Sequence, residues 1–224
     1  NERKYRFLNL SRNLTDDKSW DLVVSLDGHE AVDDLDIVRD LNAPLVRFLE
    51  RLPTLSIFPL PQERREQLDR LAMDIAGVRW EAPVGVSELR FHFLDGLSGS
   101  RRSPEVPDPV AAMLNYDARE ALVLSPFLSG DGLDRITEKV RGETTVLSRV
   151  DSIDKLRELP SNVSTFLFDD AQLNDESDPS IPLTGLHAKG IFMRHRSRRS
   201  QSVAFIGSAN ATAGGLRDNI EFMV

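Results

Sequence analysis

Apolar and polar residues alternate in several short runs of this chain, and elsewhere apolar positions recur three and four residues apart. Alternation is typical of half-buried strands, and the longer period is typical of amphipathic helices. In the first hundred residues the alternation predicts strands over 5–11, 21–28 and 88–96. The helical period predicts a helix over 62–76 that Gly77 stops, and helical structure over 31–52. Pro44 leaves open whether 31–52 forms two helices or one kinked helix.

The pattern changes after residues 97–109, a segment rich in Ser, Gly and Pro that is the best candidate for a linker. Beyond it, strands alternate with short helices. Strands are predicted over 121–129, 144–150, 163–170, 186–193, 203–210 and 220–224, and helices over 132–142 and 152–160. This order predicts an α/β fold, with mixed sheets flanked by helices and functional residues at strand ends. The boundary suggests two domains, 1–100 and 105–224.

Composition narrows the class of protein. Of 224 residues, 40% are hydrophobic and 29% are charged, as in ordinary globular proteins. Cysteine is absent, which excludes disulfides, thiol catalysis and cysteine-ligated zinc, and fits a cytoplasmic location. No apolar run is long enough to predict a membrane span. The histidines have no metal-ligand spacing with the acidic residues, so we predict no metal and no cofactor.

Two segments share one layout, which suggests an internal repeat. Each has an apolar strand, then Ser-x-Asn-x-Thr, a polar turn, and an acidic residue that opens another apolar strand. The first copy contains Ser11, Asn13, Thr15 and Asp21; the second contains Ser208, Asn210, Thr212 and Glu221. The distance from Asn to acid is three residues shorter in the first copy, so Asp21 is the less secure match.

His187 and Lys189 stand two residues apart on a predicted strand, so their side chains should point to the same face. A neutral imidazole can attack phosphorus or protonate a leaving alkoxide. An ammonium group nearby would stabilise the negative charge that develops on the phosphoryl group. Asn210 could donate to a phosphate oxygen, Ser208 could shape the turn, and Glu221 could orient the imidazole.

"LHAKGIFM" and "VAFIGSANATAGGLRDNIEF" together resemble the phospholipase D superfamily, whose halves carry His-x-Lys, then Gly-Ser-x-Asn, then an acidic residue. The resemblance covers about residues 5–26 and 118–224. It implies a phospholipase D-like fold of two pseudo-repeated halves, with the first half truncated at its N-terminus. It also implies metal-independent phosphodiester chemistry through a phosphohistidine. His187 would be nucleophile or acid, and Lys189, Asn210 and Asn13 would bind phosphate, with Ser11 and Asp21 in support.

The chain departs from the family pattern in two ways. Arg194 occupies the place where the fuller motif has an Asp, five residues after the Lys. Active members use two histidines that face one another, whereas this chain contains one His-x-Lys. The partner histidine would come from a first half that precedes Asn1 or from a second copy in a homodimer; otherwise the site would have none.

A basic run between the last strands, with Arg194, Arg196, Arg198 and Arg199, could contact a nucleic-acid backbone. The net charge of −8 argues against nucleic-acid binding by the whole surface. We therefore expect a nuclease that acts on DNA or RNA rather than on lipid, alone or with further domains of the same chain. The alternative is a catalytically silent module for nucleic-acid binding or assembly.

Overall fold

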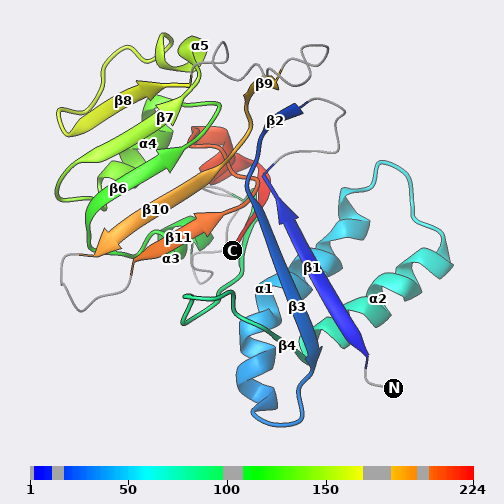
Figure 1. The fold of residues 1–224 in the computed structure, drawn as a ribbon. Coiled ribbons are helices and arrows are strands. Elements are labelled where there is room, and N and C mark those ends of the chain that lie inside the picture. The colour runs from blue at the N-terminus through cyan, green and yellow to red at the C-terminus, as the bar shows by residue number, and fades with distance from the viewer. Residues whose placement is uncertain (1–2, 12–17, 98–107, 169–182, 196–201) are drawn as a thin grey trace. The chain divides into compact units, whose positions relative to one another are not determined.

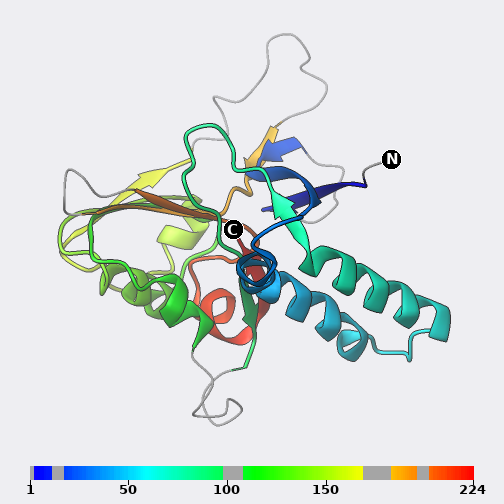
Figure 2. The same cartoon turned by 90° about the horizontal axis from the view of Figure 1, so that it is seen from below.

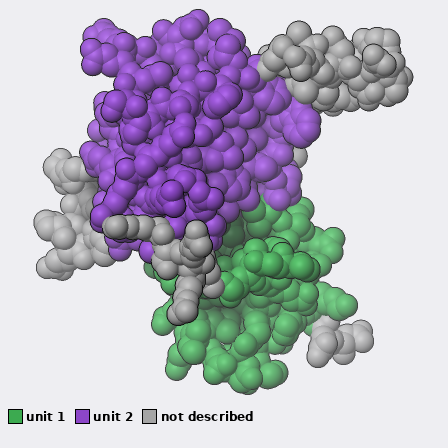
Figure 3. Space-filling model, turned by 60° about the vertical axis from the view of Figure 1, so that its left-hand side comes forward, with its two compact units in different colours: residues 1–8, 24–93, 224 green, residues 9–23, 94–223 purple. Residues whose placement is uncertain are grey.

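A computed structural model describes residues 3–11, 18–97, 108–168, 183–195 and 202–224. The chain forms a mixed α/β structure with several open sheets and divides into two compact units. Unit 1 comprises residues 1–8, 24–93 and 224, and unit 2 comprises 9–23 and 94–223 (Figure 3). The described residues of the segment 9–23 are therefore grouped with the second half of the chain.

Unit 1 consists mainly of a small sheet and a pair of helices (Figure 1). The sheet has the strand order β1-β3-β4, and β3 and β4 are antiparallel. The strands are β1 Lys4–Leu10, β3 Val23–Glu30 and β4 Val78–Trp80, and the helices are α1 Leu35–Leu55 and α2 Gln62–Ala76. Strand β5, His92–Asp95, spans the boundary with unit 2. The bounds of α2 are those that the periodicity predicts.

Aromatic rings and one amide make up the centre of unit 1. The ring of Phe7 lies 5.9 Å from that of Trp80 and 5.3 Å from that of Phe91, measured between centroids. Asn42 is fully buried in α1, and its side chain bonds to α2, β4 and the indole N–H of Trp80. Pro44 lies inside α1, so the segment 31–52 contains one helix that continues through the proline.

Unit 2 contains the remaining strands and several short helices. Its strands are β2 Lys18–Trp20, β6 Ala118–Leu124, β7 Thr144–Ser148, β8 Val163–Leu167, β9 Leu183–Leu186, β10 Gly190–His195, β11 Val203–Ile206 and β12 Ile220–Met223. Its helices are α3 Pro109–Met113, α4 Gly130–Thr137, α5 Val150–Ile153 and the π-helix η3 Gly214–Asp218. The prediction of a helix over 152–160 was wrong in extent, because α5 is a single turn.

A five-stranded mixed sheet in the order β11-β10-β6-β7-β8 is the framework of unit 2. Strands β6, β7 and β8 are parallel, whereas β10 is antiparallel to both β6 and β11. One face of the sheet carries Val123, Val146 and Ile191, which belong to the same buried cluster as Leu133 of α4 and Leu216 of η3. Figure 2 shows α4 and η3 on this same side of the sheet.

Within the described residues, no helix is both long and apolar enough to cross a membrane.

Candidate functional site

The predicted site residues of the second copy meet at one edge of the five-stranded sheet. Gly190, the first residue of β10, pairs with Leu124 at the end of β6 and with Ile206 at the end of β11. His187 comes just before β10 and Ser208 just after β11, so both lie where β6 ends. Parallel strands commonly carry their functional residues at this carboxyl end.

Residues 187–189 do not form part of a strand, which corrects the prediction of one continuous strand over 186–193. Strand β9 ends at Leu186 and β10 begins at Gly190, and the two strands belong to different sheets. Lys189 is only 7% exposed, and its ammonium group donates to the main-chain carbonyls of Ser11 and, at 3.1 Å, of His187. These bonds occupy two of the three N–H donors of an ammonium group.

A turn built on Ser208 holds Glu221 beside the sheet edge. The Ser208 hydroxyl donates to the Glu221 carboxylate and accepts from the Phe222 main-chain N–H at 3.0 Å. The Ser208 N–H donates to the Phe222 carbonyl at 3.1 Å. Gly207 allows this close approach, because a Cβ there would lie 2.0 Å from the Phe222 carbonyl oxygen. Glu221 is thereby held next to the residues that follow β11.

The same hydrogen bonds occur around Ser11. Its hydroxyl donates to the Asp21 carboxylate at 3.4 Å and accepts from the Leu22 N–H at 2.9 Å. Its main-chain N–H donates to the Leu22 carbonyl at 3.0 Å. Ser11 and Asp21 are ten residues apart, and Ser208 and Glu221 are thirteen apart, yet each acid takes the same place relative to its serine.

Side chains join the two serine turns. The Asn9 amide donates to the Ile206 carbonyl at 3.1 Å, and Lys189 reaches the carbonyl of Ser11. The His187 N–H donates to the carbonyl of Trp20 at 2.9 Å, one residue before Asp21. The hydrogen-bonding roles of Asn9 and Trp20 were not predicted, because these bonds link residues that are far apart in the sequence.

Burial shapes the electrostatics of the site. It lowers the pKa of Lys189, and the nearby carboxylates of Glu221 and Asp21 oppose that shift. Burial also raises the pKa of Glu221, opposed by hydrogen bonds from Ser208 and Asn219 and by the charge of Lys189. Removal from water penalises the charged forms of both Lys189 and Glu221. The pKa values of the two groups are therefore closer together than those of an exposed lysine and an exposed glutamate.

Asn210 follows the Ser208 turn and is half-buried. Its side-chain oxygen Oδ1 is buried and accepts no hydrogen bond from any described residue. The next residue, Ala211, donates its N–H to the Ser125 hydroxyl at 2.9 Å, which ties the Asn210 turn to the end of β6. Buried polar atoms usually have a partner, so Asn210 Oδ1 is an acceptor that a hydrogen-bond donor of a water or a ligand could satisfy.

Arg194, another predicted residue, does not lie at the same sheet edge as His187. Arg194 pairs with Glu120 at the opposite end of β6 and β10. Asn13, Arg196, Arg198 and Arg199 lie outside the described residues. Within the described part of the chain, no group of three or more His, Asp or Glu side chains could hold a metal ion.

The Glu221→Gln variant tests the half-buried carboxyl group of Glu221. Because the folded-state pKa of Glu221 is raised above 4.5, the stability that its protonation provides is complete below that pH. This stability is lost as pH rises through the raised pKa, whereas the neutral glutamine loses nothing. We expect the Tm difference, variant minus wild type, to grow between about pH 4 and pH 7 in thermal melts. A difference that stays constant across this range would contradict the assignment.

No family model matches the chain, and no curated protein matches it. Among solved structures, it is similar to NucT from Helicobacter pylori, with 17% sequence identity and a TM-score of 0.34. The similarity covers 51% of this chain and 72% of NucT. Such a TM-score does not establish a common fold, so the function has to be inferred from the residues of the site.

Proposed function

We propose that this chain cleaves phosphodiesters without a metal ion, through a phosphohistidine at His187, and that its substrate is a nucleic acid. The observation that carries the proposal is the convergence of His187, Lys189 and the Asn210 turn at one sheet edge. Each group has the chemistry that such a reaction needs: a nucleophile, a cation and an amide.

The reaction would take place in two displacements. A lone pair of the His187 imidazole attacks phosphorus, a P–N bond forms, and the P–O bond to one alcohol breaks. The departing alkoxide takes a proton from a general acid. Water then attacks phosphorus and gives a proton to the group that served as general acid, which now acts as base. The P–N bond breaks, the phosphate monoester leaves, and the His187 imidazole is regenerated. The remaining N–H of Lys189 and the Asn210 amide would hold the non-bridging oxygens.

The departing alkoxide also needs a general acid. His195 is the other histidine of unit 2, but it ends β10 and so lies at the opposite end of that strand. The family resemblance implies a second His-x-Lys for this role, from a preceding half or a partner copy. The repeated serine turn supports this idea, since Ser11 and Asp21 occupy the places that such a half would supply.

One observation favours the alternative of a catalytically silent module. The Lys189 ammonium is buried and already donates to two carbonyls, as a structural lysine would. In that case the site edge would bind nucleic acid or a protein partner without cleaving it.

A metal-free assay separates these functions. The chain is incubated with end-labelled single-stranded DNA, RNA and a generic phosphodiester, with and without excess EDTA. Cleavage is read from samples quenched at neutral pH, because alkali itself hydrolyses RNA. Label on the protein is read from the DNA and generic-diester samples after denaturation in alkali, which preserves a P–N bond. We expect cleavage of the substrates and transient label on the protein. Binding without cleavage would point to the silent module, and cleavage that EDTA abolishes would exclude the phosphohistidine route.

A further inference from the structure

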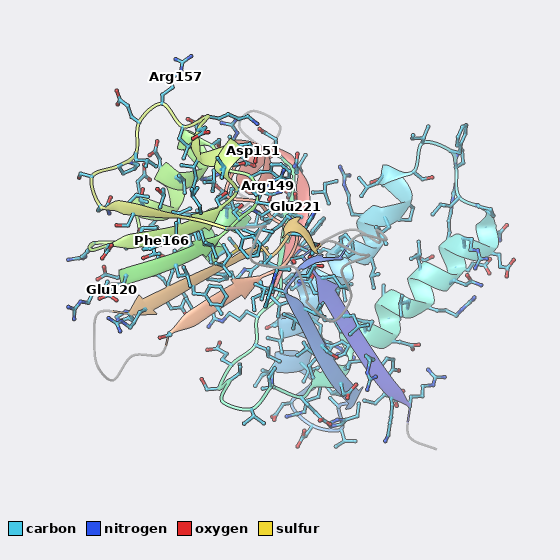
Figure 4. All side chains as sticks on the ribbon, turned by 45° about the horizontal axis from the view of Figure 1, so that its top comes forward. Glu120, Arg149, Asp151, Arg157, Phe166 and Glu221 are labelled. Carbon is cyan, nitrogen blue, oxygen red and sulfur yellow. The ribbon has the colours of Figure 1, made fainter. Side chains whose placement is uncertain are left out.

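An aromatic ring and a guanidinium group meet just beyond the ends of β6 and β7. Phe127 follows β6 and is 44% exposed, and the guanidinium carbon of Arg149 lies over its ring, 5.7 Å from the centroid. Arg149 follows β7, and Asp151 holds its guanidinium at 3.2 Å. Figure 4 shows Arg149 and Asp151 at the edge of the sheet where Glu221 also lies, with Glu120 at the opposite end.

The segment that carries Phe127 is tightly bound to the Asn210 turn. Ser125 accepts the N–H of Ala211, and Ser129 donates its own N–H to the Ala211 carbonyl at 3.1 Å. Leu128 forms a bridge with the same residue. Phe127 is therefore presented by a short loop that is anchored on both sides of it to the residue after Asn210.

The guanidinium side of the pair is also held in place. The Ser152 hydroxyl of α5 donates to the Pro126 carbonyl at 2.8 Å, and the Ser125 hydroxyl donates to the Phe127 carbonyl at 2.7 Å. The Ser152 bond joins α5, which follows Arg149, to the loop that carries Phe127, and the Ser125 bond closes that loop. A ring held this way loses little conformational entropy when a ligand stacks on it.

We infer that Phe127 and Arg149 form a stacking platform for an unpaired base of single-stranded nucleic acid; this rests on the proposed function and names its substrate. An exposed aromatic ring with an adjacent guanidinium suits a flat base with a phosphate beside it. In a duplex the bases are already stacked, and their faces are hidden. The phosphate next to the stacked base would then be positioned toward the Asn210 turn and His187.

The local charges limit attraction by phosphates alone. Asp151 carries an exposed carboxylate beside Arg149, and a carboxylate repels the phosphates of a nucleic acid as it repels an anionic membrane. Asp151 offsets the charge of Arg149, so the guanidinium serves as a planar stacking group as well as a cation. Recognition would then depend on the base as well as on the number of phosphates.

Matched variants of the full chain test the platform by fluorescence anisotropy in EDTA. The probes are single-stranded DNA, single-stranded RNA, an abasic backbone with the same number of phosphates, and duplex DNA. We expect Phe127→Ala to weaken binding of both single strands by about 5- to 150-fold. Phe166→Ala removes a ring that is more exposed, at 57%, but belongs to β8, and should change binding less than about twofold.

Arg149 has a control of the same kind. Arg141 pairs with Asp117 at 2.7 Å but precedes β7, at the opposite end of the sheet. Arg149→Ala should weaken single-strand binding several-fold more than Arg141→Ala. The inference is overturned if Phe127→Ala behaves like Phe166→Ala, or if the abasic backbone or the duplex binds as tightly as the single strands.

Hydrolysis of the generic phosphodiester is measured in parallel. A chain that prefers single strands but cleaves nothing would refute the proposed function and keep the platform. A chain that cleaves the generic diester but shows no effect of Phe127→Ala on strand binding would keep the proposed function and refute the platform.

Discussion

The His187→Ala variant is expected to lose metal-free phosphodiester cleavage by about 10³-fold or more. Alanine has no lone pair to attack phosphorus, and no other histidine of unit 2 lies at the same sheet edge. The loss should appear in kcat, because the imidazole forms its bond only during the reaction, whereas Lys189 and Asn210 would still hold the substrate. The measurement is the initial rate on the generic phosphodiester in EDTA.

His195→Ala is the matched control. His195 belongs to the same strand as the residues next to His187, but it closes that strand at the other end. It should keep most of the activity. Equal losses in the two variants would indicate a shared structural effect, and full activity in His187→Ala would remove His187 from the mechanism. Circular dichroism and thermal melts would establish that both variants are folded.

The Asn42→Ala variant is expected to lower the free energy of unfolding of unit 1 by about 4 kcal/mol. The Asn42 amide donates to the Ile75 carbonyl at 3.0 Å and to the Val78 carbonyl at 2.7 Å. Its oxygen accepts the Trp80 indole N–H at 2.8 Å. Alanine would leave these buried groups without partners, at about 1–3 kcal/mol each, with partial compensation by water.

Trp80 provides the measurement. It is 7% exposed, whereas Trp20 is 54% exposed, so denaturant titrations followed by fluorescence in a Trp20→Phe background report on unit 1. Thr54→Ala serves as control because it removes an exposed hydrogen bond from the same helix, and it should change stability by less than about 0.5 kcal/mol. An Asn42→Ala effect as small as this would show that the amide network contributes little.

Local patterns in the sequence predicted those elements whose structure depends on residues close together along the chain. Helix α2 has the predicted bounds because its amphipathic period, with Gly77 at its end, lies within one stretch of chain. It was less predictable that α1 is one continuous helix, since a proline such as Pro44 usually breaks or kinks a helix. Buried contacts of Leu45 and Leu49, just after the proline, offset that cost in the folded unit.

The sequence by itself determined the residue types of the candidate site and the repeated layout in which Ser11 precedes Asp21 and Ser208 precedes Glu221, because each repeat lies within a short segment. Only the tertiary structure decided that each serine hydroxyl bonds to its acid, that residues 187–189 separate β9 from β10, and that Lys189 reaches back to the carbonyl of Ser11. It also decided that Phe127 is anchored beside Asn210. These contacts join residues tens to nearly two hundred positions apart, and their energy comes from burial and hydrogen bonds that form only when the sheet assembles.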